Sequence, residues 1–246
     1  MRYHLGCGDV ALNGYVNVDI RDTPATDLVL DLNEPRLPAD QAAQCVFSHA
    51  FFEHLRRDSR VPHLRAVRES LAPQGFVCYM GLPDFKRVAE LYVQRGPGVV
   101  GPVFDLHNVY RYTHGDPEQS PEEGWEPQLH KSLFDVEEVG RLLRDAGYPS
   151  YVVFRYVFPH DRAEIDLSLG FYATAEQRSE AELQAACQRY LADFDGRFLQ
   201  ADTLRFEDGR SRPALVARAA GLPQKRLLQR IAYAAADRLA KNTHPA

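Results

Sequence analysis

The stretch HLGCGDVALNGYVNVDI, residues 4–20, decides the fold of this 246-residue chain. It begins with a short strand pattern that ends in Gly6-Cys7-Gly8, and a second strand pattern follows and ends at Asp19. Glycine lets the backbone turn and lets a ligand approach closely, because it has no Cβ atom. An acidic residue at the end of the next strand can accept hydrogen bonds from two adjacent ribose hydroxyls. The combination indicates a nucleoside pocket at the carboxyl ends of the strands.

The spacing of this stretch separates two kinds of nucleoside site. A dinucleotide site needs Gly-x-Gly-x-x-Gly at the start of a full helix, with an acidic residue about 20 positions further on. Here the third glycine is Gly14, and Asp19 follows Gly6 by only 13 residues. No helix N-terminus is evident that could hold a pyrophosphate. The spacing therefore disfavours NAD and favours a nucleoside without phosphates.

The rest of the chain alternates between strand and helix patterns, which predicts an α/β fold with a mostly parallel sheet. Strands are expected at about 3–5, 15–20, 28–32, 45–49, 76–82, 151–158 and 165–173, and helices at about 61–71, 84–92, 135–147, 183–198 and 227–239. Only eight residues join the first two strands, fewer than a parallel crossover usually needs. Either a single helical turn connects these two strands or the crossover helix is missing.

Two segments do not follow this alternation. Residues 96–131 contain five prolines, several histidines and aromatic residues, and no sustained period, which predicts a lid or substrate loop. Residues 216–246 carry six basic side chains and one acidic side chain. A basic amphipathic helix there could pack on its own acidic domain, or it could contact an acidic partner or an anionic membrane surface.

Composition excludes several classes of protein. There are 29 Lys and Arg residues against 34 Asp and Glu residues, and this acidic balance argues against nucleic-acid binding. No run of 18 apolar residues is present, and the first residues lack the layout of a signal peptide. The four cysteines lie mostly in apolar runs without a Cys-x-x-Cys spacing, which predicts buried, reduced thiols and a cytoplasmic location.

The run LGCGDVALNGYVNVDI resembles the first motif of class I S-adenosyl-L-methionine (SAM)-dependent methyltransferases. It is most similar to a compact bacterial branch of predicted enzymes with the pattern LGCG…G-NVD. Further similarities follow in the expected order: LVLDLNEP, SHAFFEHL, ESLAPQGFVCYMGLPDF and HKSLFDVEEVGRLLRDAGY. The resemblance covers roughly residues 2–173. It implies a Rossmann-like, seven-stranded, mostly parallel sheet in residues 1–175, including the insertion at 96–131, and a helical extension in residues 176–246.

The same resemblance implies SAM as the cofactor and assigns residues to it. Gly6, Cys7 and Gly8 would lie against the amino acid portion of SAM, and Asp19 would bind the ribose. The remaining implied contacts are Asp31 and Leu32 beside the adenine, and Ser48 and His49 on the methionine side. An alternative for Asp31 is turn chemistry, because it precedes Asn33 and Pro35.

Methyl transfer is an in-line displacement, so the enzyme mainly positions the acceptor and supplies a base where a proton must leave. The candidate catalytic residues are His49, His54, His107 and Asp84, with His114 and His130 as further histidines. His49, Glu53 and His54 resemble a metal set, but their order fits neither common zinc signature. Helix capping or packing and a place in the active-site floor are the alternative roles for Glu53 and His54, and we assign no metal from the sequence.

The resemblance implies SAM-dependent methylation, and we expect the acceptor to be a hydroxyl of a small molecule or a sugar, in glycan or natural-product biosynthesis. No nucleic-acid partner is expected. Two alternatives stay open: a SAM-binding protein without turnover, and a membrane-peripheral scaffold in polysaccharide assembly that uses the basic C-terminal helix. A nicotinamide-dependent oxidoreductase is disfavoured by the glycine spacing.

Overall fold

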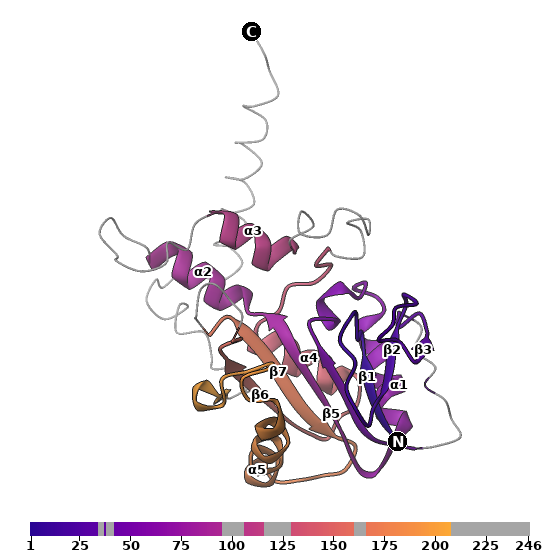
Figure 1. Cartoon of the computed structure of the whole chain (residues 1–246). Coiled ribbons are helices and arrows are strands. Elements are labelled where there is room, and N and C mark those ends of the chain that lie inside the picture. The colour runs from indigo at the N-terminus through magenta and orange to yellow at the C-terminus, as the bar shows by residue number, and fades with distance from the viewer. Residues whose placement is uncertain (34–36, 38–41, 95–105, 116–128, 160–165, 208–246) are drawn as a thin grey trace. The chain divides into compact units, whose positions relative to one another are not determined.

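The computed structural model describes residues 1–33, 37, 42–94, 106–115, 129–159 and 166–207 (Figure 1). All of them fall within one compact unit, Met1–Gly209. A second unit, Arg210–Ala246, lies outside the described residues, and so does the basic helix predicted near the C-terminus. Part of the 96–131 insertion is also outside them.

The described chain forms one eight-stranded sheet in the order β3-β2-β1-β4-β5-β7-β6-β8. The strands are β1 (Arg2–Leu5), β2 (Val16–Asp19), β3 (Leu28–Val29), β4 (Ala43–His49), β5 (Leu71–Pro83), β6 (Ser150–Tyr156), β7 (Ser168–Thr174) and β8 (Arg205–Glu207). The α-helices are α1 (Arg60–Ser70), α2 (Phe85–Gln94), α3 (Leu106–His114), α4 (Val136–Asp145) and α5 (Glu180–Leu191). Short 3-10 helices are η1 (Phe52–His54), η4 (Ala192–Phe194) and η5 (Ala201–Thr203).

The α/β class is as predicted, but the sheet has eight strands instead of the expected seven, and its parallel pairs are those among β1 to β5. The pairs among β1 to β5 are parallel, whereas β7 is antiparallel to both β5 and β6, so the sheet is mixed. Only eleven residues separate β6 from β7, and a short connection brings a chain back in the antiparallel direction. The eighth strand, β8, lies in the segment predicted to be a helical extension, and it pairs with β6. Its three residues are too few to show a period.

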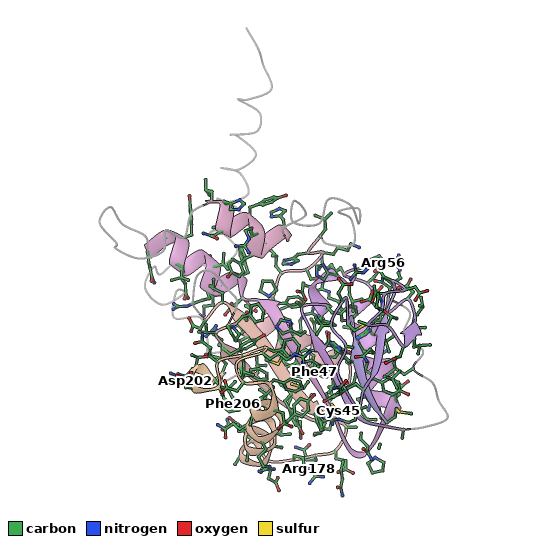
Figure 2. All side chains as sticks on the ribbon, in the orientation of Figure 1. Cys45, Phe47, Arg56, Arg178, Asp202 and Phe206 are labelled. Carbon is green, nitrogen blue, oxygen red and sulfur yellow. The ribbon has the colours of Figure 1, made fainter. Side chains whose placement is uncertain are left out.

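Alternating side chains divide the core between the two faces of the sheet. Val46, Val77 and Tyr79 pack with apolar residues of α1 and α4. Their neighbours Cys45 and Phe47 point to the opposite face and pack with α5 (Figure 2). Successive residues of a strand point to opposite faces of the sheet, so each apolar strand supplies side chains to the core on both faces. Figure 1 shows α1 and α4 on one side of the sheet and α5 on the other.

Two connections settle questions that the sequence left open. Residues 6–15, between β1 and β2, form turns without any helix, so the first crossover helix is missing. The insertion at 96–131 contains α3, although no helix was predicted there. Val109 and Tyr112 of α3 pack beside Leu91 and Tyr92 of α2, and this tertiary contact supports a helix that is too short to be stable alone.

Two predictions about the environment of the chain can be compared with the structure. All four cysteines are buried and free of disulfide bonds, which confirms the expectation of buried thiols. Within the part of the chain that the structure describes, no helix has both the length and the apolar character needed to cross a bilayer.

Candidate functional site

Strand register brings three distant residues to one edge of the sheet. Leu5 of β1 pairs with Val18 of β2 on one side and with Ser48 of β4 on the other. The next residues along these three parallel strands are therefore Gly6, Asp19 and His49. Ligands of open α/β sheets bind outside the carboxyl ends of the strands, which is where these three residues lie.

A cavity of about 550 Å³ opens at this edge. Its walls include seven of the residues that the resemblance assigned to SAM: Gly6, Cys7, Gly8, Asp19, Asp31, Leu32 and His49. Phe51, His54 and Lys131 also line it. Ser48 does not line it, because this side chain is buried at the end of β4. The structure thus brings together residues from five separate segments of the sequence.

The glycine turn is held in place by Asp19. Gly6 and Gly8 both have positive φ angles, +64° and +56°. The backbone N–H of Gly8 donates to Oδ2 of Asp19 at 2.8 Å, and that of Arg21 donates to Oδ1 at 3.0 Å. A carboxylate offers about four lone-pair directions. Asp19 can therefore fix the turn and still accept a hydrogen bond from a ligand in the cavity.

Asp31 and Leu32 form the wall after β3. Asp31 is exposed, and its Oδ1 accepts from the backbone N–H and the side-chain amide of Asn33 at 2.9 and 3.0 Å. Asp31 therefore has the turn role that the sequence left as an alternative, and it also lines the cavity. Leu32 is buried, and its carbonyl accepts from Nδ1 of His63 at 2.9 Å.

His63 connects this wall to the core of the sheet. A carbonyl can only accept, so Nδ1 of His63 carries the proton, and Nε2 accepts from the hydroxyl of Tyr79 at 2.7 Å. Burial lowers the pKa of His63 to about 4. The lone pair of Nε2 is thus used by Tyr79, and the folded protein keeps this imidazole neutral.

We expect this histidine to make the fold sensitive to acid. The ordinary pKa of a histidine is 6.5 and that of His63 in the folded protein is about 4, so between these values only the unfolded chain binds the proton. Stability should therefore fall as the pH is lowered from 6.5 to 4, by up to about 3 kcal/mol for this residue. Urea unfolding at several pH values, on the wild type and on His63→Gln, measures the difference. Equal pH slopes for the two proteins would contradict this role.

A second cavity of about 240 Å³ adjoins the first. His49 and Ala50 line both cavities, and Glu53, His130 and Phe158 line the smaller one. The ring of His49 lies 5.0 Å from the ring of Phe158. Burial lowers the pKa of His49 to about 3, with a smaller effect of His4. A nitrogen with so low a pKa is a weak base, so His49 is better suited to donate or accept a hydrogen bond than to remove a proton.

Between the two cavities lie Glu53, His54 and His130. Glu53 is only 1% exposed, and burial raises the pKa of its carboxyl to about 8. The rings of His54 and His130 are 5.2 Å apart, and burial lowers the pKa of both, that of His130 to about 3. The backbone N–H of Lys131 donates to the carbonyl of Glu53 at 2.8 Å, which fixes the end of the insertion against η1.

Two candidate catalytic residues lie elsewhere. Asp84 is fully buried, its Oδ2 accepts from Nε of Arg155 at 2.5 Å, and its Oδ1 accepts from the backbone N–H of Arg87 in the first turn of α2. It lines neither cavity. His107 is exposed on α3 and also lines neither. Of the four candidates, only His49 and His54 face the cavities.

The sequence contained a partial signal for the residues between the cavities. The motif SHAFFEHL drew attention to Glu53 and His54, with capping or packing, a place in the active-site floor and metal binding as the alternatives. His130 was one of several loop histidines, and nothing in the sequence distinguished it from His114. The contact with Glu53 and His54 joins segments far apart in the chain, so only the folded structure shows it.

No protein-family model matches this chain, and no curated protein sequence matches it either. Solved structures that match part of this chain include a SAM-dependent methyltransferase from Thermotoga maritima, with a TM-score of 0.45 and 14% identity over 71% of this chain and 82% of that chain. A glycopeptide N-methyltransferase complexed with SAM has a TM-score of 0.44 and 14% identity over 71% and 81%. The DhpI–SAH complex has a TM-score of 0.43 and 16% identity over 72% and 76%. In a further match, to a citrinin polyketide synthase CMeT domain, the chain spans 46% of that chain.

Proposed function

We propose that this protein is a SAM-dependent methyltransferase that binds SAM in the 550 Å³ cavity. The observation that supports this proposal is the convergence of the Gly6–Gly8 turn, Asp19 and Leu32 on one cavity. The volume lies in the usual range for small-molecule sites, about 300–1,000 Å³. Residues 6–15 contain no helix, so no helix N-terminus follows the turn to bind a pyrophosphate. This favours SAM over a dinucleotide.

The residues present fit such a ligand. Asp19 keeps acceptor capacity for the ribose hydroxyls, and Leu32 offers an apolar surface for the adenine. The Gly6–Gly8 turn would hold the amino acid portion. His49 lines both cavities, and its buried Nε2 has no hydrogen-bond partner among the described residues. When bound, SAM supplies a methyl group made electrophilic by its sulfonium.

We further propose that the acceptor is a hydroxyl of a small molecule or a sugar and that it binds in the 240 Å³ cavity. The shared residues His49 and Ala50 make the two cavities adjacent, as an in-line transfer requires. His49, Glu53 and His130 line this cavity, and residues of these types can hydrogen-bond to a hydroxyl. The contribution of the chain is then to hold both ligands in line and to exclude water.

We expect Asp19→Ala to weaken SAM binding by about 1–3 kcal/mol, because the variant loses a partly buried hydrogen-bond acceptor and loosens the glycine turn. This corresponds to an increase in Kd of roughly 5- to 150-fold. Calorimetric titration with SAM measures the effect. Asp22→Ala is the matched control, since Asp22 is exposed, lines neither cavity and should leave Kd nearly unchanged. An unchanged Kd in folded Asp19→Ala would refute the assigned pocket.

The activity itself is tested with radiolabelled SAM and a panel of hydroxylated small molecules and sugars. We expect label transfer to at least one class of acceptor, with release of S-adenosylhomocysteine. NAD serves as the negative control in the binding assay. Tight SAM binding without transfer to any acceptor would favour the alternative of a SAM-binding protein without turnover.

A further inference from the structure

Three potential metal ligands converge between the two cavities. Each of Glu53, His54 and His130 has one nitrogen or carboxylate oxygen within 4.8 Å of the corresponding atoms of the other two. Glu53 and His54 come from η1, and His130 comes from the end of the insertion. Glu53 and His130 line the smaller cavity, whereas His54 lines the larger one. The group therefore lies where a donor in one cavity and an acceptor in the other would meet.

Both imidazoles are oriented as metal ligands. Nδ1 of His54 lies 3.0 Å from the carbonyl of Leu129, and Nδ1 of His130 lies 3.1 Å from the carbonyl of Tyr112. Because a carbonyl only accepts, each Nδ1 must carry the proton, and each Nε2 then has a free lone pair. Metal-binding histidines typically donate their other N–H to a carbonyl or carboxylate in this way.

The carboxylate of Glu53 completes the set. Its Oε1 lies 3.9 Å from Nε2 of His54, and its Oε2 is buried with no hydrogen-bond partner among the described residues. The two imidazole lone pairs are electron donors, and so is the ionised carboxylate. A proton on Glu53, whose pKa burial raises, can join this carboxyl to only one of the two imidazoles, so the other lone pair is still not satisfied within the group. A bound cation would satisfy all three, whereas three converging acceptors without one would be unfavourable.

We propose that Glu53, His54 and His130 together bind one divalent first-row transition-metal ion. Two imidazole ligands favour zinc, cobalt or nickel over magnesium, calcium and manganese, which prefer oxygen. Ligand atoms around tetrahedral zinc, each about 2.0–2.1 Å from the ion, are roughly 3.3 Å apart, so the side chains move closer on binding. Three protein ligands leave a position open for an acceptor hydroxyl, whose pKa the ion would lower. This last role rests on the proposed function, but the site itself does not.

Metal binding by the full chain tests this proposal without SAM or an acceptor. The chelator-treated protein is titrated with Co²⁺, Zn²⁺ and Mg²⁺ by calorimetry, and Co²⁺ binding is followed by visible absorption. We expect one Co²⁺ or Zn²⁺ per chain and at least tenfold weaker binding of Mg²⁺. His130→Ala and Glu53→Gln should each weaken Co²⁺ binding by at least about tenfold. His107→Ala, an exposed histidine outside the group, should bind Co²⁺ as the wild type does.

The proposal is overturned if the folded wild type binds neither Co²⁺ nor Zn²⁺, or if folded His130→Ala and Glu53→Gln bind Co²⁺ as tightly as the wild type. Circular dichroism of each variant establishes that it is folded. SAM affinity is measured on the same samples, because failure of the two proposals must be distinguishable. Metal binding without SAM binding would leave the metal site intact and refute the proposed cofactor, and the converse result would refute only the metal site.

Discussion

Replacement of Gly6 by alanine is expected to abolish measurable SAM binding and to lower the free energy of unfolding by about 2–6 kcal/mol. Gly6 has a φ of +64°, which costs a residue with a side chain about 1–3 kcal/mol. A Cβ at this position would lie 2.5 Å from three carbon atoms of Phe51, and such overpacking costs about another 1–3 kcal/mol. Phe51 is itself a wall of the larger cavity. Any movement that relieves the overlap therefore changes the shape of the cavity.

Gly14→Ala is the matched control for this experiment. Gly14 also has a positive φ, +80°, and lies in the same connection between β1 and β2, but a Cβ there would meet no atom within 4 Å. It should therefore show the strain of the backbone without the collision, with a smaller loss of stability and nearly unchanged SAM affinity. Calorimetric titration and urea unfolding of both variants give the two quantities. Equal SAM affinity of Gly6→Ala and Gly14→Ala would show that Phe51 is not held in place by Gly6.

Replacement of Arg155 by methionine is expected to lower the free energy of unfolding by about 3–5 kcal/mol. Arg155 of β6 donates to Asp84 at 2.5 Å and to Glu207 of β8 at 2.8 Å. Asp84 is fully buried, so removal of its cationic partner leaves a carboxylate without a compensating charge in the interior. The loss is large for this reason, although the ion pair itself is weak evidence for net stabilisation.

Two variants show whether the unpaired carboxylate causes this loss. In Asp84→Asn/Arg155→Met the buried charge is absent, while the amide oxygen can still accept from the N–H of Arg87. We therefore expect this double variant to be more stable than Arg155→Met alone. Arg56→Met, at an exposed arginine (Figure 2), should change stability by less than about 0.5 kcal/mol. If the double variant is no more stable than Arg155→Met, the charge of Asp84 is not the cause.

Asp84 shows where reasoning from the sequence fails. It follows β5 directly, and a strand-end acid near a predicted pocket was a reasonable candidate base. Its partner Arg155 comes from β6, which the structure places beside the antiparallel β7. The arginine could not be matched with Asp84 before the strand order was known. Strand β8 could not be predicted for the same reason, because its three residues are defined as a strand only by their pairing with β6.

Much of the lining of the larger cavity could be predicted from the sequence, because these residues belong to local patterns. The carboxyl ends of neighbouring parallel strands lie close together. Residues at these ends therefore meet: here a glycine turn after one strand, an acid after the next and a histidine after a third. Strand direction and register alone then place Gly6, Asp19 and His49 at one edge.

By itself the sequence therefore determined the α/β class, most strands and helices, and seven of the residues that line the larger cavity. Tertiary structure alone decided the mixed sheet, the eighth strand, the helix within the insertion, the burial of Asp84 and the meeting of His130 with Glu53 and His54. The physical reason is the distance along the chain over which each kind of interaction acts. Periodicity and turn chemistry act between neighbouring residues, whereas ion pairs, buried carboxylates and converging ligands depend on contacts between segments that only the folded chain brings together.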